Sequence, residues 1–186
     1  MPHMEHFRTD RLVARDWRTA DASSAFAIYG RDEVMRWLGP QPRVAVPSLE
    51  QMRVRLDAMA ERGAVEPDYG LWPLELRSSR QVIGAVLLQL LPGSDRVEIG
   101  WHLNPEHWGH GYATEAARGA VELAFGARGL DCIVAVVDPD NVRSLAVCRR
   151  LGMVHCGQTT EYFGLTLELF ELARALSADA AAPTGR

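Results

Sequence analysis

The chain contains no lysine: all 20 of its basic residues are arginine, against 24 acidic residues. The absence of lysine excludes every mechanism that uses a lysine nucleophile, a Schiff base or a phosphate-loop lysine. A formal net charge of −4 argues against nucleic acid as the main partner, because phosphate binding requires a dense basic face. No run of like charge is long enough for a membrane-binding patch.

Cysteine is also scarce. Cys132, Cys148 and Cys156 form no C-x-x-C pair. A sparse, odd set is typical of free thiols in a reducing compartment rather than of a secreted disulfide framework, so we expect a cytoplasmic protein. The longest apolar run, Val82–Leu91, is too short to span a bilayer. The N-terminus lacks the apolar core of a signal peptide.

Three histidines, His102, His107 and His110, lie close together in the sequence. They are spread over a predicted strand, a loop and a helix start, and no cysteine or paired carboxylate completes a set of metal ligands. We therefore expect no metal.

The composition is otherwise that of one ordinary globular domain. With 186 residues, 47% of them hydrophobic, the chain is long enough to bury a core without disulfides or metal. Neither an internal repeat nor a linker is visible, which predicts a single domain over residues 1–176. The alanine-rich segment 177–186 is expected to be a disordered tail.

Hydrophobic periodicity predicts the order of the secondary structure. Strands are expected at 11–17, 74–77, 82–90, 97–103, 132–137, 154–161 and 165–172. Helices are expected at 19–29, 32–38, 48–63, 113–124 and 142–151. Ser48 and Gln51 have the spacing of a capping box at the start of the third helix. This order predicts a mixed α/β fold with helices on the faces of a sheet.

The most informative segment is the glycine-bearing loop His107–Thr114, which follows a predicted strand and opens a predicted helix. Small residues let the backbone turn tightly and bring successive N–H groups close to an anion. The N-terminus of the helix adds unpaired donors and a favourable dipole. Each hydrogen bond to a charged acceptor is worth about 1.5–3 kcal/mol, so a few of them can hold a pyrophosphate. A strand–helix connection without a ligand fits the same residues.

Two familiar phosphate loops do not fit this segment. A dinucleotide-binding fingerprint requires a small residue three positions after Gly111, where Thr114 stands, and an early βαβ unit that is missing. A Walker loop requires a lysine.

Three ordered segments carry a wider pattern. The first comprises Glu98–Pro105 and Trp108–Ala116; the second Asn141, Ser144, Val147 and Leu151–Met153; the third Thr9–Leu12, Asp32–Val34 and Trp37–Gly39. Together they resemble the acetyl-CoA signature of the GNAT superfamily of N-acetyltransferases, and are most similar to its RimJ/RimL-like ribosomal-protein branch. The resemblance spans residues 9–172.

The resemblance implies a fold and a cosubstrate. The fold would be a mixed, mostly antiparallel sheet of about seven strands, splayed between the fourth and the fifth, with helices on both faces. Acetyl-CoA would lie in the splayed cleft, and its acetyl group would pass directly to a primary amine. The residues implied to bind the cofactor are Trp101, His102, Leu103, Gly109, His110, Gly111, Tyr112, Ala113, Thr114, Asn141 and Ser144. Asn141 also fits as the N-cap of the helix at 142–151.

The sequence departs from the family at its usual proton-transfer groups. The position of the common catalytic tyrosine holds Cys148, and the position of a common strand glutamate holds Val136. Two other residues are left as catalytic candidates. Ser144 is placed to hydrogen-bond the thiol sulfur, and Glu98 is placed to act as the base directly or through water.

The missing groups favour an acceptor that loses its proton easily. Deprotonating a lysine amine at pH 7 costs about 4.6 kcal/mol, whereas an α-amine costs only about 1.4 kcal/mol. We therefore expect a protein or peptide N-terminal α-amine. A small amine such as an aminoglycoside and, from another class, a non-catalytic acyl-CoA-binding sensor remain as alternatives. An exposed edge in the last predicted hairpin would allow a homodimer.

Overall fold

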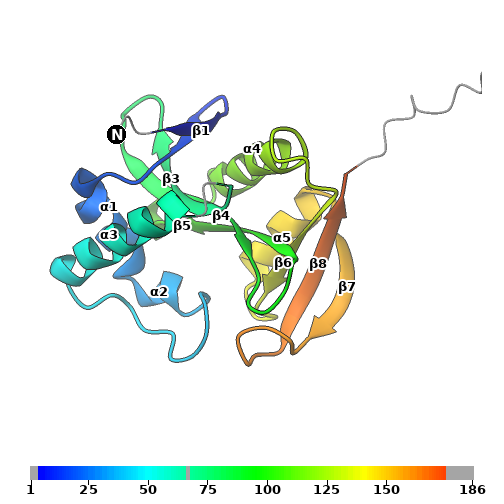
Figure 1. Ribbon diagram of the computed structural model, residues 1–186. Coiled ribbons are helices and arrows are strands. Elements are labelled where there is room, and N and C mark those ends of the chain that lie inside the picture. The colour runs from blue at the N-terminus through cyan, green and yellow to red at the C-terminus, as the bar shows by residue number, and fades with distance from the viewer. Residues whose placement is uncertain (1–3, 66–67, 175–186) are drawn as a thin grey trace, which may run out of the picture.

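The computed structural model describes residues 4–65 and 68–174 (Figure 1). The predicted tail at 177–186 lies outside these residues. The strands are β1 (Glu5–Arg8), β2 (Leu12–Arg15), β3 (Gly70–Leu76), β4 (Val82–Leu90), β5 (Val97–Leu103), β6 (Cys132–Val137), β7 (Val154–Thr159) and β8 (Leu167–Ala173). The α-helices are α1 (Ala22–Tyr29), α2 (Asp32–Met35), α3 (Leu49–Val65), α4 (Tyr112–Phe125) and α5 (Val142–Arg150), and the short 3-10 helices are η1 (Thr19–Asp21) and η2 (Pro105–His107).

The strands described form one sheet in the order β1-β2-β3-β4-β5-β6-β8-β7. Neighbours run antiparallel except β5 and β6, which confirms the predicted mixed, mostly antiparallel fold. The sheet has eight strands rather than about seven. The additional strand, β1, was missed because its sequence, Glu5–Arg8, carries charges at both ends and no apolar alternation. The last hairpin does present an edge, since β7 ends the sheet.

The sheet opens between β5 and β6. These two strands pair in parallel at a single position, where Glu98 lies opposite Val134. By contrast, β5 pairs with β4 along its whole length, and β6 does the same with β8. Figure 1 shows the two halves of the sheet diverging on either side of this contact. The splay therefore lies between the fourth and fifth predicted strands, as expected.

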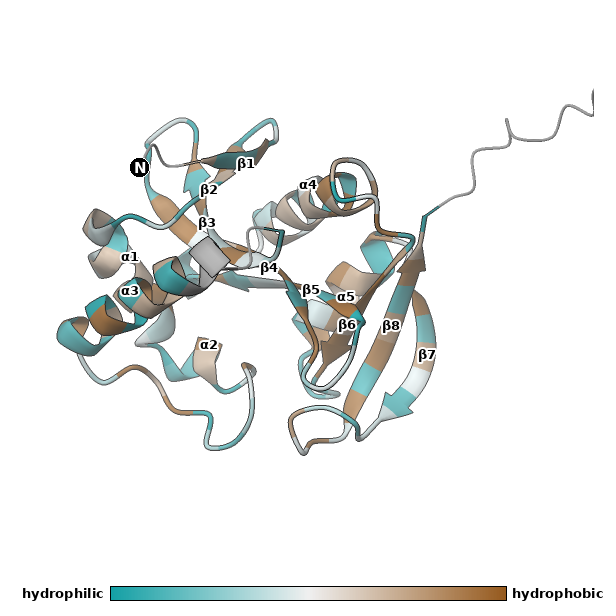
Figure 2. Ribbon diagram, in the orientation of Figure 1, coloured by the Kyte–Doolittle hydropathy of each residue, from teal (hydrophilic) through white to brown (hydrophobic). Residues whose placement is uncertain are grey.

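Helices cover both faces of the sheet. On one face, α4 packs an alanine stripe, Ala116, Ala117, Ala120 and Ala124, into the main core, and each of the four has 0% exposure. Such small side chains bring the helix axis close to the strands. Figure 2 shows the apolar stretches that run along the strands beneath it. The other face is covered by α1, α2 and α3, which share a second core with β4.

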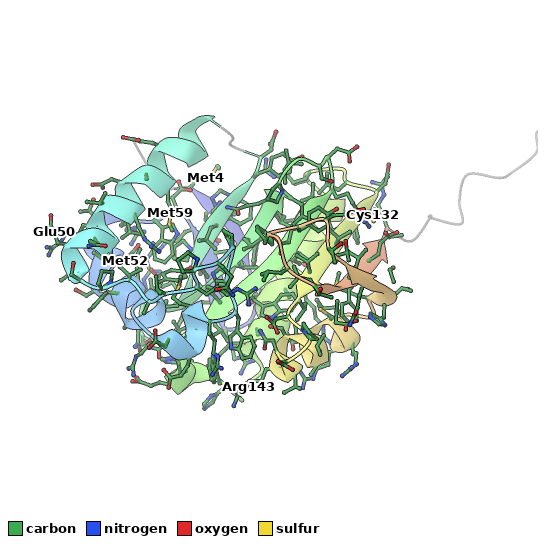
Figure 3. All side chains as sticks on the ribbon, turned by 90° about the horizontal axis from the view of Figure 1, so that it is seen from below. Met4, Glu50, Met52, Met59, Cys132 and Arg143 are labelled. Carbon is green, nitrogen blue, oxygen red and sulfur yellow. The ribbon has the colours of Figure 1, made fainter. Side chains whose placement is uncertain are left out.

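The helix α3 presents one apolar side to this second core. Met52 and Leu56 are buried there, whereas Glu50 points outward, as Figure 3 shows for Met52 and Glu50. The Ser48 hydroxyl accepts a hydrogen bond from the Gln51 N–H at 3.2 Å, which confirms the side-chain cap at the start of α3.

The helix α2 is shorter than the predicted 32–38. It ends at Met35, because the N–H groups of Trp37 and Leu38 bond to carbonyls three residues back, at 3.2 and 3.1 Å. The chain thus tightens into turns before Gly39, whose φ is +67°. This places Trp37 on the segment that connects α2 to α3. None of the described helices has the length and apolarity needed to cross a membrane.

A buried ion cluster joins the first strands to η1. The Arg15 guanidinium donates to Asp21 at 2.7 Å and to Glu75 at 2.8 Å, and these residues are only 4%, 8% and 1% exposed. Buried charges are tolerated when each is paired and hydrogen-bonded. The cluster ties β2, β3 and the chain leading into α1 together beneath the second core.

We predict that Arg15→Ala destabilises the protein by about 3–5 kcal/mol, because it removes the buried guanidinium that pairs with both carboxylates, and the more exposed Arg80, 2.8 Å from Glu75, does not reach into its place. Urea unfolding of the variant and the wild type measures this difference. Arg53→Ala is the matched control: Arg53 forms an exposed pair with Glu50 on α3 and should cost about 0.5 kcal/mol or less. A loss below about 1 kcal/mol for Arg15→Ala would show that the cluster is not needed for stability.

Candidate active site

A large cleft of about 1550 Å³ lies where β5 and β6 part. It runs from the start of α4 and the face of α5 to the segment after α2 and the turn between β7 and β8. Most of the residues expected at the site line it. They are Glu98, Trp101, His102, Leu103, Gly109, Gly111, Tyr112, Ala113, Thr114, Asn141 and Ser144. His110 is exposed outside the lining, with its Nδ1 2.9 Å from the Trp108 carbonyl.

The edge of β5 presents unpaired backbone groups to the cleft. The Asn104 N–H donates to the Ile83 carbonyl at 2.9 Å, which sets the alternation of the antiparallel ladder with β4. The amides of Trp101 and Leu103 therefore point towards the space that β6 has left. The amide of His102 points towards β4, so this residue reaches the cleft through its side chain alone. Of the three residues expected to bind the cofactor on this strand, only Trp101 and Leu103 can therefore contact a ligand through the backbone.

The glycine loop turns sharply into α4. Gly109 and Gly111 both have φ of +81°, a left-handed conformation that favours glycine. The first bond inside α4 runs from the Glu115 N–H to the Gly111 carbonyl at 3.1 Å. The N–H groups of the three preceding residues, 112–114, therefore have no partner within the helix. They lie at the positive end of the helix dipole and line the cleft, which makes this segment a cradle for an anion.

Glu115 anchors this cradle to the turn between β1 and β2. Its carboxylate accepts hydrogen bonds from the Thr9 hydroxyl at 2.6 Å, the Arg11 N–H at 2.8 Å and Arg11 Nε at 2.6 Å. Partial burial opposes ionisation, but these donors outweigh it and lower the pKa of Glu115. Arg11 also donates to the His110 carbonyl at 3.0 Å and stacks over the Tyr112 ring. The loop is thus held in shape before any ligand arrives.

Arginine side chains line this end of the cleft as well. Arg11 and Arg118 line it on the side of α4, and Arg143 and Arg150 line it on α5. The guanidinium of Arg143 stacks 4.5 Å above the Trp108 ring, and Figure 3 shows this residue at the start of α5. Arg11 lies within the Thr9–Leu12 segment of the sequence pattern, but the pattern did not indicate that these cations gather, because they come from separate elements and meet only in the fold.

The helix α5 brings both of its predicted residues to the cleft. The Asn141 side-chain oxygen accepts from the Ser144 N–H at 3.2 Å, so Asn141 is the N-cap of this helix. Its side-chain NH₂ remains as a donor, and capping is therefore compatible with a ligand contact. Cys148 is fully buried in the main core, where burial raises the pKa of its thiol to about 12. It packs the helix and does not line the cleft, whereas Val136 does.

Side chains alternate between the two faces of a strand, so Glu98 and His102, two residues before and after Gly100, lie on the same face of β5. Burial raises the pKa of Glu98 to about 8. No hydrogen bond or ion pair to its carboxylate is found among residues 4–65 and 68–174. A carboxylate with this pKa can accept a proton from an amine near neutral pH.

His102 is held as a neutral group. Burial lowers its pKa to about 4, and its Nδ1 lies 3.0 Å from the hydroxyl of Tyr29, which is buried in α1. Burial also raises the pKa of Tyr29 above its usual value. Neither group therefore places a charge beside Glu98 at pH 7. Within the described residues, no three His, Cys, Asp or Glu side chains gather as a metal site.

The comparisons agree with this geometry. The family model described as acetyltransferase (GNAT) domain matches residues 11–154. The chain belongs to the GNAT family of acetyltransferases. The uncharacterized N-acetyltransferase YoaA of Bacillus subtilis (strain 168) is 33% identical over 156 residues, which cover 83% of this chain and 85% of that protein. This GNAT protein is accordingly an acyltransferase enzyme.

Solved structures share the GNAT fold at low identity. The RimL ribosomal L7/L12 alpha-N-protein acetyltransferase is 14% identical with a TM-score of 0.75, over 92% of this chain and 95% of that one. RimJ of Mycobacterium smegmatis, in complex with CoA-disulfide, is 19% identical with a TM-score of 0.72, over 87% of this chain and 81% of that one.

The raised pKa of Glu98 predicts a pH-dependent stability. Because folding raises this pKa from 4.5 to about 8, its contribution is fully present below pH 4.5 and is lost as the pH rises through about 8. Glu98→Gln stays neutral and escapes this loss. The melting temperature of the variant, relative to the wild type, should therefore be higher at pH 9 than at pH 5.

Differential scanning calorimetry at the two pH values measures this shift. Glu50→Gln, which removes one charge from an exposed position of α3, is the matched control. If the melting temperatures of Glu98→Gln and the wild type differed by the same amount at both pH values, the raised pKa of Glu98 would be contradicted.

Proposed function

We propose that this GNAT enzyme transfers an acetyl group from acetyl-CoA directly to a primary amine, and that the amine is an α-amine such as a peptide N-terminus. The single observation that carries the proposal is the placement of Glu98, a base with a raised pKa, in a cleft that begins at an anion-binding helix terminus. The likeness of the fold to the RimJ and RimL structures supports the RimJ/RimL-like branch.

The cleft fits the parts of acetyl-CoA. The N–H groups of 109–114 would hold the pyrophosphate, with the arginines Arg11 and Arg143 close by. The free amides of Trp101 and Leu103 and the NH₂ of Asn141 would hold the amide groups of the pantetheine arm. Acetyl-CoA supplies an activated thioester carbonyl when it is bound at this position.

The remaining chemistry is proton transfer by the chain itself. The Glu98 carboxylate accepts a proton from the acceptor ammonium and leaves a neutral, nucleophilic amine. Ser144 lines the cleft from α5, and its hydroxyl would hydrogen-bond the leaving sulfur. As the C–S bond breaks, CoA leaves as a thiolate whose conjugate acid has a pKa of about 8.5, so no strong acid is required. This thiolate takes up the second N–H proton that the amine loses when it becomes an amide. The departure of CoA is therefore compatible with Cys148 at the family's usual tyrosine position, and Glu98 would replace the base that is missing at Val136.

The pKa of Glu98 favours an α-amine over a lysine side chain. Proton transfer to a base with a pKa of about 8 is nearly balanced for an α-amine, whose own pKa is also about 8. The same transfer from a lysine ammonium, with a pKa near 10.4, costs about 3.3 kcal/mol. A small-molecule acceptor with an amine of similar pKa satisfies the same condition and is the second candidate.

The decisive experiment follows thiol release from acetyl-CoA with a panel of amino-acid amides, N-acetyl-lysinamide and spermidine. The best α-amine should exceed N-acetyl-lysinamide by about tenfold or more in kcat/KM. Faster reaction of N-acetyl-lysinamide or spermidine would contradict the α-amine proposal. Tight binding of CoA without thiol release from any amine would instead support a sensor module.

Glu98→Gln tests the base. We expect kcat to fall by about 10²–10⁴-fold, with the affinity for CoA unchanged in calorimetry. The wild-type kcat should rise with pH up to about 8, because the carboxylate must be ionised to accept the proton. The variant should lack this dependence. A variant that retains both kcat and the pH profile would remove Glu98 from the mechanism.

Gly111→Ala tests the anion cradle. A Cβ at φ +81° is strained, and relief of this strain would turn the following N–H groups away from the cleft. We expect the Kd for CoA, measured by titration calorimetry, to rise by about tenfold or more. Gly93→Ala is the matched control, since Gly93 has φ of +68° in the β4–β5 turn and does not line the cleft. Equal affinities in both variants would place the pyrophosphate elsewhere.

A further inference from the structure

We call the acceptor chamber that part of the cleft which borders the Glu98 face of the sheet, the segment after α2 and the turn between β7 and β8. In Figure 1 the segment after α2 and the turn between β7 and β8 lie on opposite sides of the opening between the strands, and residues of both line the cleft. The side chains that line the acceptor chamber are mainly apolar. They are Trp37, Leu38, Leu71, Leu87, Val136, Phe163 and Leu167.

The chamber holds one carboxyl group that has no ion-pair partner among the described residues, that of Glu98. Of the acidic side chains that line the cleft in the described part of the chain, only Glu98 and Asp138 lie at this end. Asp138 is neutralised by Arg43, whose Nη1 donates to it at 2.6 Å. His102 at the same surface is neutral, as described above. A single carboxylate in an apolar surround accommodates one ammonium group and leaves further positive charges without partners.

One wall is fixed in place by Arg43. This side chain is only 7% exposed and also donates to the carbonyls of Arg36 and Gly39, at 3.0 and 3.1 Å. It thereby fastens the segment that carries Trp37 to the end of β6, across the opening of the sheet. The indole of Trp37 is further held by the guanidinium of Arg36, 4.9 Å from the ring.

The opposite wall presents Phe163 from a strained turn. Phe163 and Gly164 have φ of 58° and 67°, and the Leu165 N–H closes the turn on the Tyr162 carbonyl at 3.2 Å. Glycine adopts this conformation without strain, but a phenylalanine there costs about 1 kcal/mol or more. Such strain is typical of positions where the side chain serves a ligand. Trp37 and Phe163 thus line the same cleft as Glu98, from segments more than a hundred residues apart in the chain.

We propose that the acceptor is a monocationic primary amine that carries an aromatic or large aliphatic group beside the amine-bearing carbon, and that Trp37 and Phe163 determine this specificity. The inference rests on the proposed function, since it takes Glu98 as the base. An N-terminal residue with a large apolar side chain and a free aralkyl amine share this chemistry. A polycation such as an aminoglycoside does not.

The test compares amino-acid amides, which share one type of α-amine. Phenylalaninamide and leucinamide should exceed alaninamide by about 10–100-fold in kcat/KM, and spermidine and kanamycin should be slower still. The tripeptide Phe-Ala-Ala and phenylalaninamide distinguish a peptide from a small acceptor. Equal rates for phenylalaninamide and alaninamide, or a preference for spermidine or kanamycin, would overturn the proposal.

Variants of Trp37 and Phe163 test whether these two side chains cause the preference for a large apolar group. Trp37→Ala and Phe163→Ala should each lower kcat/KM for phenylalaninamide by about tenfold or more, and change it less than about threefold for alaninamide. Phe163→Gly removes the ring and relieves the backbone strain. It therefore provides the same comparison if Phe163→Ala folds poorly. Val44→Ala is the control, at a 59% exposed position in the same segment that does not line the cleft.

Binding gives a readout that is independent of turnover. Titration calorimetry should show that N-acetyl-phenylalaninamide binds the wild type about tenfold or more tightly than N-acetyl-alaninamide, and that Phe163→Gly abolishes the difference. CoA affinity should be unchanged in these variants. Turnover of several α-amines without aromatic preference would overturn this inference alone, whereas the absence of turnover with every amine would overturn the proposed function too.

Discussion

The parting of β5 from β6 is the constraint on which the rest of the structure depends. Strands that separate after the single pair Glu98–Val134 leave backbone N–H and C=O groups without a neighbour in the middle of a sheet. Such groups require other partners. The open edge of β5 and the first turn of α4 present their donors to the same cleft. One departure from regular pairing therefore produces both the space for a ligand and the polar groups that line it.

The opening is supported by contacts that hold each side of the cleft in a fixed shape. Glu115 ties the glycine loop to Thr9 and Arg11, on the first half of the sheet. Arg43 reaches from the segment after α2 to Asp138, on the second half. The charges of both anchors are paired: Arg11 with Glu115, and the buried Arg43 with Asp138. Glu98 is the contrast: its carboxylate lacks a partner in the described residues, and burial raises its pKa to about 8.

The sequence predicted local features better than distant contacts. A continuous apolar run predicted β4, alternating apolar residues predicted β5, and the spacing of Ser48 and Gln51 predicted the start of α3. The four residues of β1 carry no such pattern, and they form a strand because β2 offers an edge to pair with. The contact of Arg11 with Glu115 spans 104 residues, and no local signal indicates it.

The sequence by itself determined two local features of the site. The loop before α4 carries glycines where the backbone is left-handed, and an asparagine stands at the N-cap of α5. Family membership followed from that order of residues and the family model confirms it. Only the tertiary structure decided the state of Glu98, because its pKa depends on how deeply the surrounding chain buries it. It also decided that Trp37 and Phe163 face one chamber, since elements far apart in the chain meet there only after the sheet has folded and opened.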